Sequence, residues 1–118
     1  DMEKLSDGEW RLMELLWETP SINSTQLVAL CRERLDWSKS TTYTVLRRLV
    51  HKGAAENKAA TVTPKITREE ALRAQEAELT RQAGGFFPLI TAFFSGKQIT
   101  PQEAEELKRL IDQHTWEG

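Results

Sequence analysis

The sequence predicts a mostly α-helical protein with one small β-hairpin, in which three helices precede the hairpin and three follow it. Two patterns mark the helices: capping residues followed three positions later by Glu or Gln, and apolar residues that recur at helical spacing behind them. Residues 53–66, GAAENKAATVTPKI, instead carry short β-competent pieces on either side of a polar connection, and these predict the hairpin.

The first three helices are expected to begin after the capping residues Ser6, Asn23 and Ser38. Thr19 and Pro20 end the first helix, and residues 35–37 form a brief turn between the second and third. The residues expected to face inward are Trp10, Met13, Leu16 and Trp17 in the first helix and Leu27, Val28, Leu30, Cys31 and Leu35 in the second.

The hairpin follows Gly53, which ends the third helix. Strands are expected at Ala54–Glu56 and Thr61–Thr63, joined by the four residues 57–60, and Ile22 supplies a single strand residue beside them. Helix, helix, turn, helix and hairpin in this order are typical of a winged helix-turn-helix, which we assign to residues 1–66.

Three further helices occupy residues 67–118, beginning at Thr67, near Pro88 and at Thr100, and Gly84-Gly85 stops the first of them. About fifty residues bury too little surface to be stable alone, so self-association is expected to cover their apolar side chains. A ligand pocket lined by the aromatic residues is the alternative. The residues assigned to dimerisation are Phe86, Phe87, Leu89, Ile90, Phe93, Phe94, Leu107, Leu110 and Ile111.

Composition limits the possible classes of protein. The longest apolar stretch, FFPLITAFF at 86–94, is shorter than the ~20 residues of a membrane helix, so no membrane insertion is expected. No signal-peptide pattern opens the chain. Cys31, the single cysteine, cannot form an internal disulfide, which fits a cytoplasmic location.

The formal net charge of −2 conceals a segregation of charge along the chain. Residues 1–36 and 69–118 each carry −4, whereas residues 37–68 carry +6. A basic middle segment between acidic ends favours a polyanionic partner such as double-stranded DNA.

The third helix has one apolar and one polar face. The expected core face consists of Thr42, Val45, Leu46, Leu49 and Val50. The expected DNA-binding residues are Lys39, Ser40, Thr41, Tyr43, Thr44, Arg47, Arg48, His51, Lys52 and, in the hairpin, Lys58. In a helix-turn-helix this helix enters the major groove, where hydroxyl groups and arginines can bind base edges while the terminal lysines bind phosphates. A solvated polar face without a partner is the alternative.

No catalytic, metal or cofactor site is expected. His51 and His114 lack cysteine or carboxylate neighbours at metal-ligand spacing. No Gly-rich phosphate loop is present, and the carboxylates of the last helices are typical of solvated faces.

Three segments together resemble the penicillinase repressor family (BlaI/MecI type): LSDGEWRLMELLW, WSKSTTYTVLRRLVHKG and ITREEAL. The resemblance covers nearly the whole chain. It implies a bacterial winged-helix transcriptional repressor of resistance or stress genes that binds a palindromic operator as a homodimer. By motif position the family's DNA contacts fall on Ser40, Thr41, Tyr43, Thr44 and Arg48.

The sequence departs from the family pattern at several positions. Relatives often have basic residues where Ser40 and Tyr43 stand, and the wing lacks the family's arginine and aromatic residues, leaving Lys58 as the only cation in the loop. The C-terminal cysteine pairs of copper-responsive relatives are also missing. The resemblance further implies cleavage by a membrane sensor protease, which alignment assigns to the Ala92–Phe93 bond.

Two other functions remain open from the residues alone. One is a repressor that senses a ligand through the aromatic C-terminal helices. The other is a winged-helix module that binds protein rather than DNA, against which the absence of acidic residues from the third helix argues.

Overall fold

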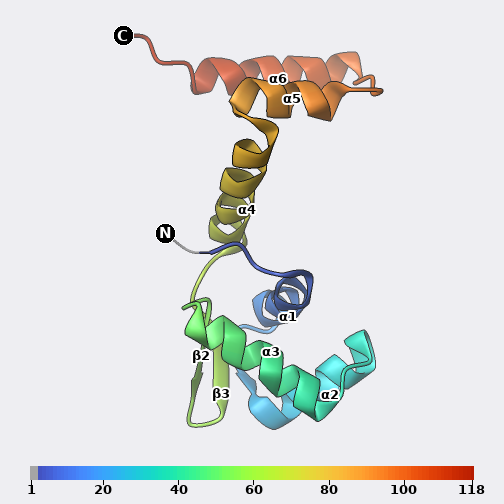
Figure 1. The fold of residues 1–118 in the computed structure, drawn as a ribbon, viewed down its shortest axis with the longest axis vertical. Helices are drawn as coiled ribbons and strands as arrows, with labels where there is room; N and C mark the ends of the chain where they lie inside the picture. Colours follow the sequence, from blue (N-terminus) through green and yellow to red (C-terminus); the bar gives the residue numbers. More distant parts are fainter. Residues whose placement is uncertain (1–2) are drawn as a thin grey trace. The chain divides into compact units, whose positions relative to one another are not determined.

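The computed structural model describes residues 3–118, which form two compact units that divide after Arg81 (Figure 1). The predicted class is confirmed: six helices accompany one small antiparallel sheet in the described part of the chain. The first unit contains α1 (Asp7–Glu18), β1 (Ile22–Asn23), α2 (Ser24–Leu35), α3 (Lys39–His51), β2 (Ala55–Lys58), β3 (Thr61–Pro64) and most of α4 (Arg68–Ala83). The second contains α5 (Phe86–Phe94) and α6 (Pro101–Gln113).

Capping boxes begin three of the helices as the sequence predicts. At α1, the Ser6 hydroxyl accepts the Glu9 amide while the Glu9 carboxylate accepts the Ser6 amide. Thr67 and Thr100 form the same reciprocal bonds with the glutamates three residues later. Asn23 also caps α2, but its side chain accepts the amide of Thr25, two residues on. These bonds satisfy amides that the first turn of a helix leaves without partners.

The sheet has the order β1-β3-β2, and its register determines which wing residues face the rest of the domain. Val62 pairs with Ile22 on one side and with Asn57 on the other, so these three residues lie on one face of the sheet. Val62 and Ile22 are buried, which identifies that face as the one turned toward the core. Lys58 pairs with Thr61 and therefore lies on the opposite face.

The hairpin turn is shorter than predicted. The expected four-residue connection is wrong because β2 continues to Lys58, which leaves only Ala59 and Ala60 between the strands. Both alanines have positive φ angles, 52° and 63°, as a type I′ turn requires. Alanine is disfavoured there, but the Ala60 carbonyl accepts the Ser24 amide at 2.8 Å, which ties the turn to the start of α2.

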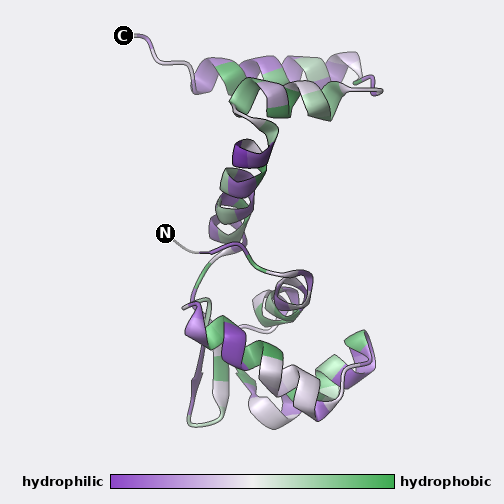
Figure 2. Ribbon diagram, in the orientation of Figure 1, coloured by the Kyte–Doolittle hydropathy of each residue, from purple (hydrophilic) through white to green (hydrophobic). Residues whose placement is uncertain are grey.

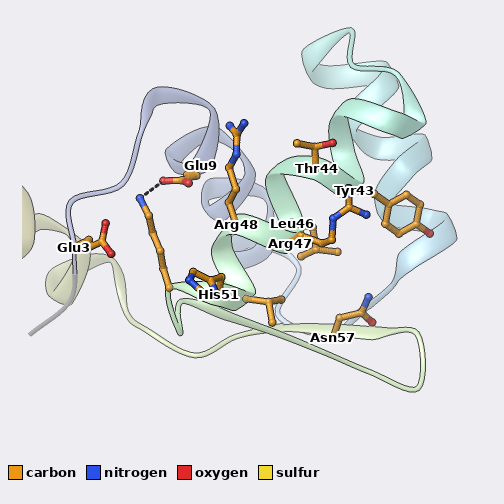
Figure 3. Close-up of a pocket in the computed structure, with 11 residues that line it drawn as sticks. Glu3, Glu9, Tyr43, Thr44, Leu46, Arg47, Arg48, His51 and Asn57 are labelled. Atoms are coloured by element: carbon orange, nitrogen blue, oxygen red, sulfur yellow. Dashed lines mark hydrogen bonds and ion pairs between the residues drawn. The ribbon is translucent and has the colours of Figure 1, made fainter.

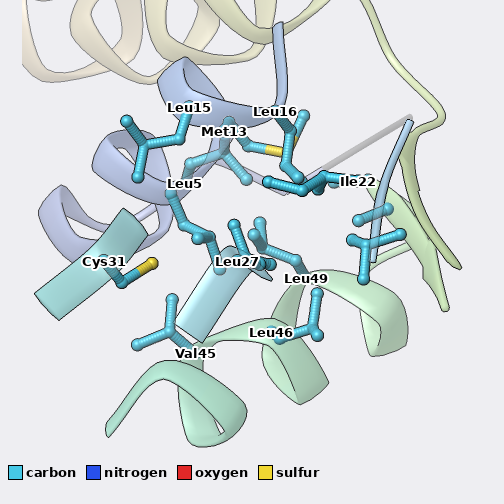
Figure 4. Packing of buried hydrophobic residues seen from close by; sticks show 14 of the residues in the cluster. Leu5, Met13, Leu15, Leu16, Ile22, Leu27, Cys31, Val45, Leu46 and Leu49 are labelled. Atoms are coloured by element: carbon cyan, nitrogen blue, oxygen red, sulfur yellow. The ribbon is translucent and has the colours of Figure 1, made fainter. Parts of the chain in front are cut away.

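The core lies between α1, α2, α3 and the sheet (Figure 4). Leu12, Met13, Leu16, Leu27 and Leu49 are among its fully buried side chains. The predicted burial of Cys31 is confirmed, whereas Trp10, Trp17, Val28, Leu30 and Leu35 are only half-buried. Both tryptophans pack against the rim of the core and contact each other edge to face at 5.5 Å.

One residue of the predicted core face of α3 is misassigned. Val50 is 42% exposed, while Thr42, Val45, Leu46 and Leu49 are buried as expected. Val50 follows Leu49 directly, so it lies about 100° further around the helix, beyond the edge of the buried stripe.

Trp17 attaches the start of α4 to the first unit. Its indole N–H donates to the Ile66 carbonyl at 2.9 Å, and the Arg68 guanidinium lies over its ring at 4.8 Å. Arg68 also reaches Glu14 at 3.6 Å, and Ala71 is buried one turn further on. The first turns of α4 therefore pack with the winged unit, beyond the predicted domain boundary at residue 66.

In the second unit, α5 begins two residues earlier than predicted, at Phe86. Pro88 fits inside the first turn because the amides there have no helical acceptor to lose. Gly84 and Gly85, with φ angles of 90° and 139°, separate α5 from α4 as predicted. None of the helices in residues 3–118 is long and apolar enough to cross a membrane.

An ion pair in the first unit joins the first turn of α1 to the end of α3. The Lys52 ammonium lies 2.6 Å from Glu9 Oε1 and donates to the Lys4 carbonyl at 3.0 Å. Glu9 is 3% exposed. Burial raises the pKa of its carboxyl, but the bonds from Lys52 and the Ser6 amide outweigh burial and leave the pKa below its ordinary value of 4.5.

We expect Glu9→Gln to lower the free energy of unfolding at neutral pH by about 2 kcal/mol, the typical contribution of a hydrogen bond to a charged group. A depressed folded-state pKa gives stability that is present above the unfolded pKa and is lost as pH falls through the folded pKa. The difference between variant and wild type should therefore shrink in acid. Urea unfolding across this pH range, at one protein concentration, would measure it.

The matched control is Glu18→Gln, which breaks the exposed pair with Arg34 and should change stability by less than about 1 kcal/mol. Equal effects of the two substitutions, or a Glu9→Gln deficit that persists unchanged in acid, would contradict a structural role for the Glu9–Lys52 pair.

Candidate nucleic-acid interface

The start of α3 is fixed by hydroxyl groups. The Ser38 hydroxyl accepts the Thr41 amide at 3.1 Å and donates to the Thr41 hydroxyl at 3.1 Å. The buried Thr42 hydroxyl donates to the Ser38 carbonyl at 3.0 Å. Burial raises the pKa of the Cys31 thiol, which contacts Thr42, so this cysteine remains a neutral core residue.

The outward face of α3 is polar and carries no acidic residue. Most of its side chains are exposed, although Tyr43 and Thr44 are half-buried and Tyr43 packs partly against the core. The exposed members are Lys39, Ser40, Thr41, Arg47, Arg48 and His51. This face therefore combines hydroxyl groups with cations. It has no carboxylate that would repel a phosphate.

Arg47 and Arg48 form no ion pair with any residue in 3–118. Elsewhere in the first unit, Arg34, Lys65 and Arg68 each lie within 4.0 Å of a glutamate. The two α3 guanidinium groups consequently keep all their donors for a partner.

A groove with a volume of about 830 Å³ runs along this face between α3 and β2 (Figure 3). It brings together six of the residues predicted to bind DNA and adds five that were not predicted. The predicted residues are Tyr43, Thr44, Arg47, Arg48, His51 and Lys52; the others are Glu3, Glu9, Leu46, Val50 and Asn57.

The remaining predicted residues lie outside the groove. Lys39, Ser40 and Thr41 are exposed on the first turn of α3. Lys58 is exposed on the outer face of the wing. Lys52 lines the groove, but its ammonium is held by Glu9 and the Lys4 carbonyl, so its charge is already balanced inside the domain.

Among the groove residues that were not predicted, Asn57 has the clearest signal in the sequence. Side chains alternate along a strand, so a residue paired with an inward-facing valine must also point toward α3. That inference needs the hairpin register, which the four-residue turn obscured. Glu9 was predicted only as a cap, because its second partner, Lys52, is 43 residues away.

The second unit exposes most of its apolar side chains. Figure 2 shows hydrophobic residues along α5. Phe86 and Phe87 are 70% and 76% exposed, while Leu89 and Ile90 are half-buried. The other residues predicted for dimerisation are also exposed: Phe93, Phe94, Leu107, Leu110 and Ile111. Apolar exposure on this scale in a short helical unit is typical of an interaction surface.

The fold and the acid-free face of α3 define a winged-helix DNA-binding protein. Residues 5–113 match the penicillinase repressor family, so the chain belongs to that family. Its members are DNA-binding transcriptional repressors and not enzymes. Residues 3–118 contain no group of three or more His, Cys, Asp or Glu side chains that could hold a metal ion.

Two curated relatives span nearly the whole chain. The penicillinase repressor of Bacillus licheniformis is 25% identical over 117 residues, which cover 94% of this chain and 91% of the relative. The methicillin resistance regulatory protein MecI of Staphylococcus aureus (strain N315) is 24% identical over 119 residues, covering 92% of this chain and 94% of the relative.

Two solved structures resemble the winged unit. One is the solution structure of the DNA-binding domain of the repressor BlaI, and the other is monomeric Bacillus licheniformis BlaI in complex with the blaP half-operator. Each is 28% identical with a TM-score of 0.51, and the match covers 59% of this chain and 90% of the other.

Proposed function

We propose that this protein represses transcription by binding an operator as a homodimer, with one α3 in the major groove of each half-site. The observation that carries the proposal is the exposed, acid-free face of α3, where Arg47 and Arg48 have no partner within residues 3–118. The complex of BlaI with the blaP half-operator supports it, since that domain has a similar fold.

The residues of α3 take separate roles in this proposal. The first turns of a recognition helix lie nearest the base edges, so Ser40, Thr41 and Thr44 are assigned to base contacts, with Tyr43 beside them. Arg48 is assigned to bidentate recognition of a guanine. Lys39 and Arg47 are assigned to phosphates, and His51 and Lys58 are peripheral contacts at the helix end and wing.

The apolar surface of the second unit supports self-association. A two-fold dimer presents two α3 helices to a palindrome whose half-sites lie about one helical turn apart. Once one winged domain of the dimer has bound, the second is held close to its own half-site. The dimer therefore binds the full operator more tightly than a single winged domain binds a half-site. The operator complex would then exclude the transcription machinery from the same DNA.

In this proposal, repression is relieved by breaking the dimer. The proposed cut, by a membrane sensor protease, is the Ala92–Phe93 bond, two residues from the end of α5. Both residues are exposed, and Phe93 belongs to the apolar surface assigned to the dimer. Co-expression with the sensor protease, followed by mass spectrometry, should reveal a fragment that ends at Ala92; an uncut chain in a responding cell would refute this route.

We expect Arg48→Ala to weaken specific operator binding by ~1–3 kcal/mol if Arg48 reads a base, with little change on non-specific DNA. Equal losses on both DNAs would instead assign Arg48 to a phosphate. Fluorescence anisotropy with an operator recovered by binding-site selection would measure both. Arg73→Ala, which removes an exposed arginine of α4, is the matched control and should bind as wild type does.

Operator affinity should also fall steeply with salt, at about 0.9 log units per phosphate contact per log unit of salt concentration. The reason is that each neutralised phosphate releases condensed counterions. An affinity that stays constant as salt rises would argue against DNA as the partner.

We expect a dimer in sedimentation velocity at micromolar concentration, and a monomer for Phe87→Asp, because a buried charge without a partner opposes association. Circular dichroism would check that the variant retains its helices, and Leu110→Ala offers a milder loss. Trp116→Ala, which removes an exposed aromatic side chain outside the assigned surface, is the control. A monomeric wild type would refute the role assigned to the second unit.

A further inference from the structure

The residues that line the groove between α3 and β2 are chemically complementary to a sugar–phosphate strand. Leu46 and Val50 give it an apolar floor, which suits deoxyribose. Polar groups stand along both sides: Tyr43, Arg47 and His51 on α3, and Asn57 on β2. Since α3 is the element assigned to the major groove, the space beside it is where one backbone strand of the duplex must pass.

Asn57 is the wing residue that faces this groove. Its pairing with the buried Val62 turns its side chain to the α3 side of the sheet, whereas Lys58 pairs with Thr61 and faces away. Figure 3 shows the Asn57 amide extending from β2 toward the side of α3 that carries Tyr43 and Arg47. The side chain is exposed and makes no hydrogen bond with residues 3–118, so its NH₂ donors are free.

The charges along the groove favour phosphate binding at the part of the groove that Asn57 lines. Lys52 neutralises Glu9, and Glu3 remains as a carboxylate among the lining residues. Asn57 and Arg47 both line the groove, and Arg47 forms no ion pair within residues 3–118. A phosphate between these two groups meets one cation and one neutral donor.

We infer that the groove between α3 and β2 holds one strand of the operator backbone and that the Asn57 amide donates to a phosphate there. This inference rests on the proposed function and extends it from α3 to the wing. The wing then contacts a phosphate through a neutral side chain on its inner face. Lys58, the only cation near the turn, lies on the outer face. Among the wing positions, substitution of Asn57 is therefore expected to weaken operator binding.

The test uses the full chain and a duplex recovered by binding-site selection with the wild-type protein. Asn57→Ala should weaken binding roughly fivefold, the loss of one hydrogen bond. The salt dependence should not change, because a neutral amide releases no counterion. Asn57→Asp should lose more than about tenfold, since it brings a carboxylate to a phosphate.

Glu56→Gln is the matched control on the neighbouring, outward-facing position and should not weaken binding. A second readout separates contact from structure: a methylphosphonate at the contacted position should weaken the wild type more than it weakens Asn57→Ala, in which only the Arg47 contact remains to be lost. Thermal unfolding of each variant would check the fold of the hairpin.

Wild-type affinity for both Asn57 variants, with Arg48→Ala still weakened, would overturn the inference and leave the proposed function in place. A methylphosphonate effect equal in wild type and Asn57→Ala at every position would also overturn it. If Arg48→Ala binds the duplex as tightly as the wild type, the assignment of α3 itself fails, whatever the Asn57 variants do.

Discussion

The arrangement of the winged unit depends on one buried carboxylate. Glu9 caps the first turn of α1 and at the same time holds Lys52 at the end of α3, with the Lys4 carbonyl as a further partner of that lysine. Apolar burial has no preferred direction, so the buried residues of α3 fix its orientation through close packing alone, whereas a hydrogen-bonded ion pair adds a directional constraint. The pair resists displacement, because a displaced lysine would leave Glu9 charged, buried and alone. This contact, together with the buried side chains of α3, fixes the orientation of the outer face of that helix.

The same constraint divides the cations of the basic segment into two groups. Lys52 is balanced inside the domain and Arg68 stacks on Trp17, so both contribute to structure. Arg47 and Arg48, like Lys39 and Lys58, form no ion pair within residues 3–118 and can bind a phosphate or a guanine. The charge of +6 on residues 37–68 therefore overstates the positive field offered to DNA. What matters is which cations the fold leaves unpaired.

Local signals in the sequence were sufficient for the helices and for the class of fold. Capping pairs such as Ser6–Glu9 act within three residues, so the helix starts could be predicted and are observed. The errors arise where the deciding partner is distant in sequence. Val50 belongs to a helical stripe whose edge is determined by what packs there, and the turn at Ala59-Ala60 is held by Ser24, far upstream. Neither Lys52's partner nor the inward direction of Asn57 is visible without the tertiary contacts.

These contacts give the interface a particular balance between charge and neutral hydrogen bonding. Ser40, Thr41 and Thr44 offer hydroxyl groups where cations would bind phosphate more strongly, and the inner face of the wing offers an amide. Neutral donors gain little from counterion release, so they contribute less to non-specific binding than lysine or arginine would. They lose more when a mismatched base or displaced phosphate leaves them unpaired in a dry interface. An interface of this kind sacrifices affinity for each half-site and retains discrimination, and it therefore depends on a second half-site. In the proposed dimer, the exposed phenylalanines of α5 would bring that second half-site into reach.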